Sequence, residues 1–567
     1  MSNSSGGALD FLKKENIIAP EGYNRWRVPP ASIAIHLCIG SVYAWSVFNP
    51  PLTRELGVVA SAAEDWSLSS VVWIFSVAIV SLGLAAAFGG KWLEKVGPRY
   101  VGVVAATLWG GGFLIGSLGI SSHQLWLVYL GYGVLGGAGL GLGYVSPVST
   151  LIRWFPDRRG MATGMAIMGF GGGAMIGAPL IQWLLELFQK APTFLGAEGA
   201  VALVTEGGKR FAETASGKIE VVVATVEQAA TFGGEAGVYV VGSGNTGAAS
   251  TFMALGIGYF IVMMIAAFQY RVPREGWKPE GWVPKPSTSG LVTRNNVHID
   301  QALRTPQFWL LWIVLCFNVT AGIGVIGVAK TMINEIFGDL ALVTAAFAGT
   351  YVLMISVFNM VGRFIWASTS DFIGRKNTYH CFFVLGTLLY VSIPYWAGMG
   401  GTGALFGFYV ATMVIFTMYG GGFATIPAYL ADIFGTMHVG GIHGRLLTAW
   451  STAGVLGPFA ITYLRNLSKD NAIADLASKV DPAAFAEKFG APLTQLNELV
   501  AAKTVTIAGL MDIVPAGTVD PTSSLYNTTM YCMAALLVIA FFANLMVRPV
   551  GERHHVEKTH PDAVAAE

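Results

Sequence analysis

The sequence predicts an all-α membrane protein made of two similar six-helix halves. Of its 567 residues, 54% are hydrophobic and only 12% are charged, and the mean hydropathy is +0.58, which no ordinary soluble domain reaches. Apolar runs of about 20 residues, the length that crosses a bilayer core, recur along the chain. A short loop motif also occurs twice, at equivalent places in the two halves. Together these observations indicate a polytopic, internally duplicated protein.

Twelve apolar runs, separated by short polar or Gly/Pro-containing breaks, are predicted to span the membrane. They are 31–52, 69–89, 101–120, 125–147, 160–184, 251–270, 307–329, 341–366, 379–398, 404–428, 443–465 and 526–547. The first thirty residues lack a short apolar core with a small-residue cleavage site, so we expect no removable signal peptide.

The basic residues of the short loops predict the topology, because Lys and Arg favour the cytoplasmic side. We expect a plasma membrane protein, in the inner membrane of a bacterium, with both termini cytoplasmic. The expected order is a cytoplasmic segment (1–30), the amino-terminal half (31–270), a cytoplasmic linker (271–306), the carboxy-terminal half (307–547) and a cytoplasmic tail (548–567). The linker is rich in Pro and Gly, as is typical of a joint between halves.

Two long polar inserts lie between the fifth and sixth predicted helices of each half. The insert at 186–250 has β-branched runs that favour a small β element, and the insert at 467–524 favours short amphipathic helices. Both are predicted on the non-cytoplasmic face, where we expect them to meet as a partial cap. The segment GSGNTG (242–247) matches a dinucleotide fingerprint, but a membrane span follows it instead of a βαβ unit, so we expect no nucleotide there.

Several other functions are disfavoured by what the sequence lacks. It contains no GxxxxGK[ST], HExxH or GxSxG pattern, which disfavours an ATP-driven pump and a membrane hydrolase. The four cysteines all lie within predicted spans and suggest no disulfide or zinc framework. Net charge is +1, which suggests no nucleic-acid partner. We expect no enzyme activity, cofactor or metal, and a chain that works as a monomer in the lipid bilayer.

The duplicated loop motif follows the second helix of each half. Its members are Gly90, Glu94, Gly97 and Arg99 in the first copy, and Ala367, Asp371, Gly374, Arg375 and Lys376 in the second. The small residue allows two helix ends to approach, the acid can cap or pair at a neighbouring helix terminus, and the basic residues hold the loop at the interface. One copy alone would suggest a plain positively charged turn. Two copies in register predict a cytoplasmic gate between the halves of a duplicated fold.

Arg363 is unusual because it lies inside the predicted span 341–366. It precedes Asp371 by eight residues, which places it about 12 Å up the helix from the cytoplasmic loop. An arginine at that depth is costly and should face the interior of the bundle. No acidic residue of the predicted spans is an obvious partner, so the guanidinium is predicted to bind an anion, with a carboxylate matching its planar fork. The alternative is that the side chain snorkels to the cytoplasmic interface.

Aromatic residues of other spans are candidates to line the same cavity. They are Tyr43, Trp45, Tyr144, Phe170, Tyr419 and Phe423. Each alone is more commonly a packing or interfacial residue. Lys330 is a possible second cation at the outer mouth, although an interfacial lysine would have the same sequence signal. His36, in the first span, is more commonly a packing residue than a proton carrier.

Five segments together resemble the oxalate/formate antiporter family of the major facilitator superfamily, which is related to monocarboxylate transporters. They are GSVYAWSVFNPPL, RWFPDRRGMATG, LRTPQFWLLW, GRFIWASTSDFIGRK and ADIFGTMHVGGIHGR. The resemblance covers all twelve predicted helices and omits the inserts, and it implies the major facilitator fold.

The resemblance also implies the substrate-binding residues. Arg363 corresponds to the family's carboxylate-binding arginine, and its aromatic cage corresponds to Tyr43, Tyr144, Phe170, Tyr419 and Phe423. The oxalate exchanger has a second cation, a lysine, in the eleventh helix, where this chain has Trp450. Proton-coupled monocarboxylate transporters carry an aspartate one turn before the arginine, where this chain has Asn359.

These two differences shape the expected function. With one fixed cation, a monoanion such as formate, lactate or pyruvate becomes more plausible than the dianion oxalate. Without the aspartate, simple proton symport is weakened, and we expect a secondary transporter that exchanges small carboxylates by alternating access. Two alternatives stay open: a proton-coupled monocarboxylate symporter and a carboxylate sensor on a carrier fold.

Overall fold

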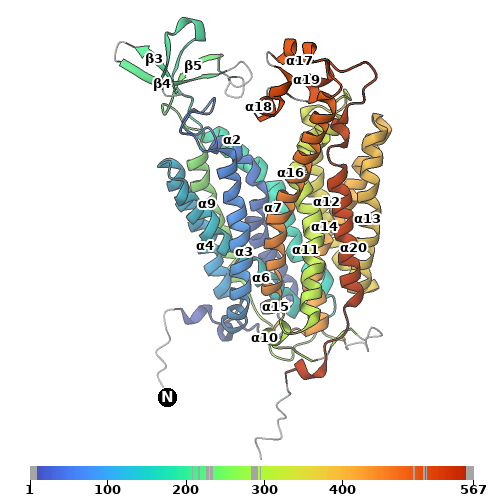
Figure 1. Ribbon diagram of the computed structural model, residues 1–567. Helices are drawn as coiled ribbons and strands as arrows, with labels where there is room; N and C mark the ends of the chain where they lie inside the picture. The colour runs from blue at the N-terminus through green and yellow to red at the C-terminus, as the bar shows by residue number, and fades with distance from the viewer. Residues whose placement is uncertain are drawn as a thin grey trace, which may run out of the picture.

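The computed structural model describes residues 9–206, 209–214, 217–224, 229, 234–282, 291–293, 295–489, 492–501, 505 and 507–556. Long, roughly parallel helices form one bundle (Figure 1). Among the described residues, eleven helices are long and apolar enough to cross a membrane. The predicted all-α fold of two six-helix halves is confirmed.

The amino-terminal half contains six spanning segments, some of them built from several elements. They are α1 (Val28–Gly40) with the 3₁₀ turn Ser41–Val47, α3 (Leu68–Val96), α4 (Pro98–Ser121), α5 (Leu125–Val128) with the π-helical segment Tyr129–Gly136 and α6 (Gly137–Trp154), α7 (Arg159–Phe188) and α9 (Ala248–Gln269). The short helix α2 (Asn49–Leu52) precedes α3.

The carboxy-terminal half repeats this plan. Its elements are α11 (Pro306–Phe337), α12 (Ala345–Ile373), α13 (Arg375–Met399), α14 (Gly401–Phe434), α15 (Val439–Leu446) with α16 (Thr448–Ala477), and α20 (Asn527–Met546). The predicted span 443–465 is therefore the α15–α16 pair. Helix α16 continues to Ala477, so the second insert begins as an extension of a bundle helix rather than as a separate element.

The two halves meet mainly along α7 and α3 of the amino-terminal half. Helix α7 packs on α12 and α14, and α3 packs on α15 and α16. Glycine makes this approach possible: a Cβ on Gly90 of α3 would lie 2.7 Å from the Cα of Gly441 in α15, too close for any real side chain. The same holds at Gly160 of α7, where a Cβ would lie 2.0 Å from the Ala367 carbonyl oxygen.

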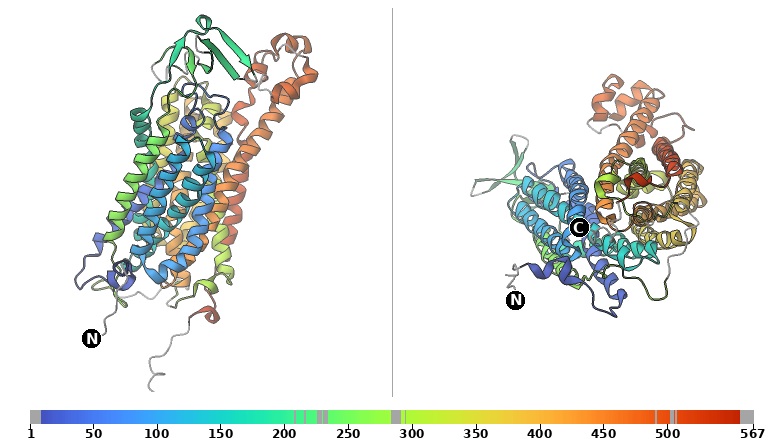
Figure 2. Two further views of the ribbon diagram at one scale, coloured as in Figure 1. Left: turned by 90° about the vertical axis from the view of Figure 1, so that its left-hand side faces the viewer. Right: turned by 90° about the horizontal axis from the view of Figure 1, so that it is seen from below.

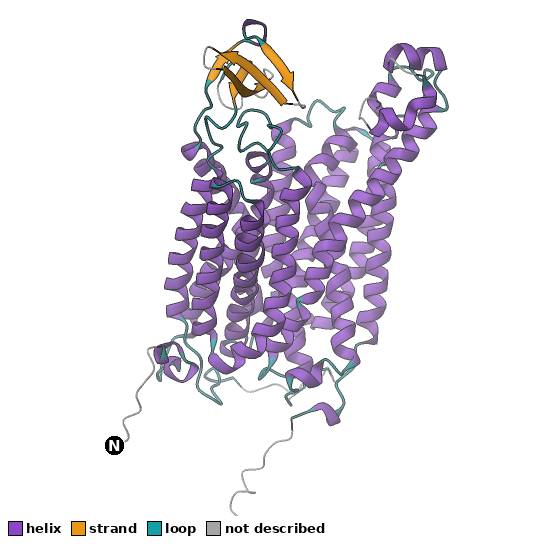
Figure 3. Cartoon of the chain, turned by 60° about the vertical axis from the view of Figure 1, so that its left-hand side comes forward, coloured by secondary structure: helices purple, strands orange, loops and turns teal. Residues whose placement is uncertain are grey.

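The two ends of the bundle differ (Figures 1 and 2). We call the end that carries the short linker helix α10 (Ile299–Ala302), together with the first and last described residues, the linker end. We call the opposite end, which carries both inserts, the insert end (Figure 3).

The first insert is an antiparallel sheet with strand order β1-β5-β4-β3-β2. Its strands are β1 (Phe194–Gly196), β2 (Leu203–Glu206), β3 (Lys209–Thr214), β4 (Gly217–Ala224) and β5 (Gly237–Val240). Val222 and Tyr239 pack on Val59 and Ala62, in the loop between α2 and α3, and this contact fixes the sheet to its own half.

The second insert carries α17 (Pro482–Phe489), α18 (Leu496–Ala501) and α19 (Ile507–Met511), as its amphipathic pattern predicts. Both predicted types of insert structure are thus confirmed. The prediction that the inserts meet is wrong for this structure: the sheet and α17–α19 stand apart over different halves (Figures 1 and 2). Both inserts lie at one end because each follows the fifth helix of its half. Helix α16 extends to Ala477, so the second insert lies farther along the axis of this helix and away from the sheet.

Candidate functional site

Arg363 lies in α12 where this helix packs on α7, and its side chain is completely buried. Its Nε donates to Asn359 Oδ1 at 3.1 Å, one turn earlier, and Nη1 donates to the Ile167 carbonyl oxygen of α7 at 3.3 Å. Small residues of α7 leave room for the guanidinium, since a Cβ on Gly171 would lie 3.1 Å from Nε. These contacts hold the side chain between the halves, which disagrees with the snorkelling alternative.

The charge of Arg363 has no counter-ion within the described part of the chain. No described carboxylate forms an ion pair with it, and its Nη2 is buried without a hydrogen-bond partner. A buried, unpaired guanidinium is expensive in an apolar interior, and an anion would offset that cost. Asn359 orients Nε but contributes no charge.

The predicted aromatic residues converge on the same point from both halves. Phe170 contacts Tyr43, Tyr144 and Trp450, with ring centroids 5.1, 5.3 and 5.4 Å apart. Phe423 stands 4.8 Å from Trp450 and 5.4 Å from Tyr419. Trp45 does not join them, because its ring packs on Tyr132 within the amino-terminal half at 4.5 Å.

The guanidinium lies between rings contributed by the two halves. Its Cζ is 5.6 Å from the centroid of Phe170 in α7 and 5.3 Å from that of Phe423 in α14. Such contacts stabilise a cation but leave its hydrogen-bond donors free. The arrangement therefore supports the charge of Arg363 without neutralising it.

Polar atoms of the cage are the clearest sign of a ligand site. Within the described part of the chain, the buried atoms without a hydrogen-bond partner of good geometry include Arg363 Nη2, Trp450 Nε1 and the hydroxyl oxygens of Tyr43, Tyr144 and Tyr419. The Tyr43 hydroxyl faces Tyr419, Arg363 and Trp450, so these donors point toward one another. Native proteins rarely bury so many unsatisfied donors together. Because every one of these groups can donate a hydrogen bond, the complementary ligand is rich in acceptors and negatively charged.

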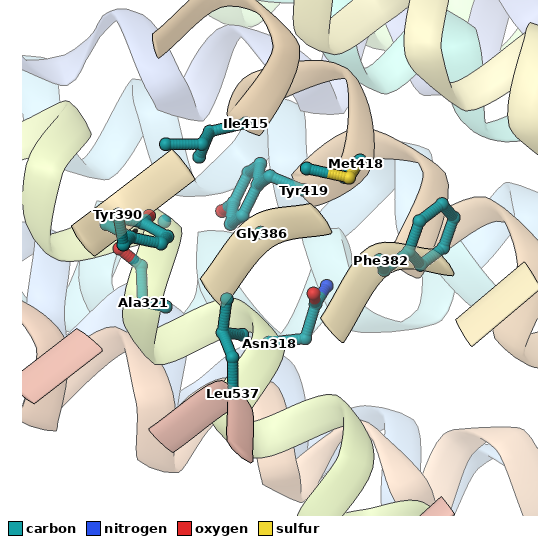
Figure 4. A pocket seen from close by; sticks show the side chains of 10 residues that line it. Asn318, Ala321, Phe382, Gly386, Tyr390, Ile415, Met418, Tyr419 and Leu537 are labelled. Carbon is teal, nitrogen blue, oxygen red and sulfur yellow. Dashed lines mark hydrogen bonds between the residues drawn. The ribbon is translucent and has the colours of Figure 1, made fainter. Parts of the chain in front are cut away.

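Tyr419 is fixed from behind by the carboxy-terminal half. A Cβ on Gly322 of α11 would lie 2.1 Å from its ring, so only glycine fits there. A small cavity of about 10 Å³, room for about one water molecule, lies beside this ring and is lined by Asn318 and Tyr390 among others (Figure 4). Tyr390 donates to the Ala321 carbonyl oxygen at 2.7 Å, whereas Asn318 Nδ2 has no hydrogen-bond partner among the residues described.

Two histidines flank the cage, and sequence reasoning missed one of them. His36 of α1 contacts Tyr144, with ring centroids 5.2 Å apart, and its Nε2 lies 3.2 Å from the Tyr144 carbonyl oxygen. His443 of α15 lies 5.9 Å from the same ring and is 1% exposed, and neither ring nitrogen has a partner in the part of the chain that the structure describes. The available signal was a histidine at the first position of a predicted span.

The acidic residues of the duplicated motif reach across the linker end. Glu94 Oε1 accepts from the Gly440 amide at 3.1 Å, near the beginning of α15, and Glu94 also pairs with Arg153. Asp371 accepts from the Gly160 and Met161 amides at 2.9 Å each, in the first turn of α7. Each carboxylate thus caps a helix of the opposite half, where the helix dipole favours negative charge.

The remaining motif residues shape the loops. Gly97 and Gly374 end α3 and α12 with φ of 89° and 85°, a conformation that favours glycine. Arg99 donates to the Phe11, Phe268 and Tyr270 carbonyl oxygens at 3.1 Å each. Lys376 donates to the carbonyl oxygens of Leu545 and Val547 at the end of α20, 2.9 and 2.8 Å away.

Further charges link the halves at this end, and no sequence pattern indicated how they would pair. Asp432 binds Arg159 of α7 at 3.0 Å and Arg375 of α13 at 3.3 Å, and Arg375 also binds Asp371 at 2.5 Å. Asp300 of the linker accepts from Arg445 at 2.6 Å and Lys91 at 2.9 Å, and these hydrogen bonds lower its pKa to about 2.

Lys330, the possible second cation, lies in α11, but its side chain is outside the described part of the structure.

The comparisons with known proteins agree with this architecture. The model of the Major Facilitator Superfamily matches residues 31–205. The fucose:proton symporter FucP of E. coli has the same fold, with a TM-score of 0.55 at 10% identity over 92% of this chain and all of that one. The chain therefore has the major facilitator fold.

Two relatives carry names that concern small carboxylates. The oxalate:formate antiporter of Oxalobacter formigenes is 26% identical over 439 residues, covering 76% of this chain and 83% of that protein. Apicoplast pyruvate carrier 1 of Toxoplasma gondii is 22% identical over 476 residues, covering 73% and 78%. The resemblance predicted from the sequence motifs is confirmed, and the chain is a multi-pass membrane protein that is similar to these carriers.

Proposed function

We propose that this transporter exchanges small carboxylates across the membrane and that Arg363 binds the carboxylate. The observation that supports this most directly is the convergence of unpartnered donors around a buried guanidinium without a counter-ion. A carboxylate accepts two parallel hydrogen bonds from an arginine fork, and the tyrosine and tryptophan donors would bind its remaining lone pairs.

The charge of the cage favours monoanions. Trp450 occupies the place where the resemblance would put a second fixed cation, and its ring makes edge-to-face contacts with Phe423 and Phe170. Formate, lactate and pyruvate are therefore better candidates than a dianion when only Arg363 is charged. The relatives named for oxalate, formate and pyruvate are consistent with this substrate class.

Exchange is proposed over proton symport because the position one turn before Arg363 is Asn359. Asn359 donates no titratable proton, and its Oδ1 is engaged by Arg363 Nε. We further propose that the two halves rock around the site, that the linker end is cytoplasmic and that a single chain suffices.

Substitutions of Arg363 test the proposal, with counterflow of labelled formate in proteoliposomes as the measurement. We expect Arg363→Ala to abolish exchange and Arg363→Lys to fold but lose most of its carboxylate affinity, because lysine keeps the charge without the planar fork. The matched control is Arg274→Lys in the linker, where the side chain is 51% exposed and pairs with Glu21. Parental exchange by Arg363→Ala would refute the proposal.

The same preparation separates the two alternatives. A sensor would bind carboxylate in a thermal-shift assay yet show no counterflow. A proton symporter would acidify the liposome lumen during net uptake, whereas carboxylate exchange would not.

Trp450→Lys tests the assignment of position 450. This substitution adds a second fixed cation near Arg363 and should shift the preference from formate toward oxalate. An unchanged ratio of oxalate to formate exchange in a folded variant would contradict the assignment.

A further inference from the structure

His443 is a buried titratable group beside the proposed carboxylate site. Both of its ring nitrogens are buried and have no hydrogen-bond partner among the described residues, although a neutral imidazole has one donor and one acceptor to satisfy. Leaving such groups without hydrogen bonds costs free energy, which a bound ligand that forms hydrogen bonds with the imidazole would offset.

The place of His443 in the fold connects it to the cage. It precedes Trp450 by seven residues, which is two helical turns, so both side chains lie on the same side of the α15–α16 segment. Both contact Tyr144, with ring centroids 5.9 and 5.3 Å away, and Tyr144 in turn contacts Phe170 beside Arg363. The imidazole therefore lies in the second row of the cage, behind Tyr144 and two helical turns from position 450.

We propose that His443 is the second cation of the site, present only when its imidazole is protonated, and that it binds the second carboxylate of a dicarboxylate. This inference rests on the proposed function. With neutral His443 the site holds one cation and suits a monoanion, whereas with protonated His443 it holds two cations and suits a dianion.

The charged and titratable groups around His443 make protonation conditional on the ligand. His36 of α1 and Tyr144 of α6 are its neighbours, and Arg363 adds a positive charge in the same cage. The acids and bases of the other elements packed on α15 form ion pairs with one another at the linker end. Glu94 of α3 pairs with Arg153 of α6, and Asp432 of α14 pairs with Arg159. Asp300 of α10 pairs with Lys91 of α3 and with Arg445. Helix α11 contributes Trp312, which donates to Thr448.

None of these described contacts supplies His443 with a carboxylate. Burial without a counter-charge opposes protonation of the imidazole. A second substrate carboxylate would provide the counter-charge, so the dianion should bind together with a proton. A dianion plus one proton carries the same net charge as a monoanion, so exchanging one for the other would move no net charge.

Proton-linked binding distinguishes this idea from a purely structural role. Calorimetry on the purified full chain, in two buffers of different ionisation enthalpy, counts the protons taken up with oxalate and with formate. Both probes keep their charge between about pH 6 and pH 8, where histidine titrates. We expect about one proton per oxalate and none per formate, and an oxalate Kd that rises about tenfold per pH unit.

Two variants test whether His443 is the group involved. His443→Gln should lose oxalate-linked proton uptake and the pH slope of the oxalate Kd. His443→Lys carries a fixed cation and should bind oxalate with little pH dependence. Because this variant keeps binding, it shows whether a loss in His443→Gln comes from the missing cation or from misfolding. His554→Gln, in the carboxy-terminal tail, is the control and should behave like the parent.

Several results would overturn the inference: a pH-independent oxalate Kd in the parent, no oxalate binding at about pH 6, or unchanged proton uptake in His443→Gln. Failure of the parent to bind any carboxylate, or exchange by Arg363→Ala, would instead count against the proposed function itself.

Discussion

The two ends of the bundle hold their charges in different ways. At the linker end, polar contacts join one half to the other: Glu94 to the Gly440 amide, Asp371 to the Gly160 amide, and Arg159 to Asp432. At the insert end, the main clusters join elements of a single half. Arg465 binds Glu335 and Tyr526 in the carboxy-terminal half, and Glu55 binds Thr246 in the amino-terminal half.

This difference indicates which contacts a rocking motion would break. The linker-end carboxylates cap helices of the opposite half, so separating the halves there would expose each carboxylate and each helix terminus to water, which can replace the bonds. The insert-end clusters would move with their own half. We infer that the linker-end contacts form a gate, closed in this structure, and that the insert-end clusters stiffen the two moving bodies.

The largest expected effect comes from neutralising both gate carboxylates. Charge-assisted hydrogen bonds contribute about 1.5–3 kcal/mol each, so Glu94→Gln with Asp371→Asn should lower exchange by more than about tenfold. The same variant should expose a cysteine placed at Ser149, which is buried beside Gly440, to a membrane-impermeant thiol reagent. Exposed Cys381 and half-buried Cys532 are first replaced by serine.

The control for the gate is Glu487→Gln on the exposed face of α17, which removes a carboxylate without touching the gate. Equal labelling of Ser149→Cys with and without the gate substitutions would show that these carboxylates do not hold the linker end closed. The two single variants should resemble each other, because each acid caps one helix across the interface.

A cluster within one half should affect stability instead of gating. Glu335→Gln leaves the partly buried Arg465 without its counter-charge, so we expect the free energy of unfolding to fall by about 1–3 kcal/mol. Thermal unfolding measures this loss, and the labelling of Ser149→Cys should stay at the parental level. Increased labelling would mean that the insert-end cluster also sets the position of the halves.

The pH dependence of the insert end should come from Glu55, whose pKa burial raises to about 7. A raised carboxyl pKa means that the folded state keeps its proton while the unfolded chain, with a pKa near 4.5, has lost it. Stability should therefore fall as pH rises from 4.5 to about 7 and then level off. Between pH 4.5 and pH 8 the parent should lose about 1–2 kcal/mol of its free energy of unfolding through Glu55. Glu55→Gln should not show this loss, as measured by thermal or chemical unfolding. Identical pH profiles of variant and parent would contradict the assignment.

The smallest effect is expected at Asp300, which bridges Lys91 and Arg445 but is 47% exposed. Because its pKa is lowered from 3.8 to about 2, Asp300 stabilises the folded state at pH values above 3.8. This contribution is lost as the pH falls toward 2. Solvent screening limits it, so Asp300→Asn should change the unfolding free energy at neutral pH by less than about 1 kcal/mol. If Asp300→Asn lowered the unfolding free energy as much as Glu335→Gln does, the linker ion pairs would be part of the contacts that hold the two halves together.

The sequence by itself determined the membrane-embedded class, the helical runs, the duplication and the singular position of Arg363. These follow from apolar length, charge and spacing, which are properties of short stretches of chain. It also predicted the structural type of each insert, because periodicities of 2 and 3.6 residues are local.

Only the tertiary structure decided which distant residues meet. Tyr43, Phe170 and Trp450 come from three different helices, and their contact depends on how the halves pack. His443 became visible as part of the site only when α15 was placed against α6, and the separation of the inserts depended on the direction of α16. The physical reason is that helix propensity acts within a few turns, whereas the packing of α3 on α15 and of α7 on α12 depends on side chains that lie hundreds of residues apart in the chain.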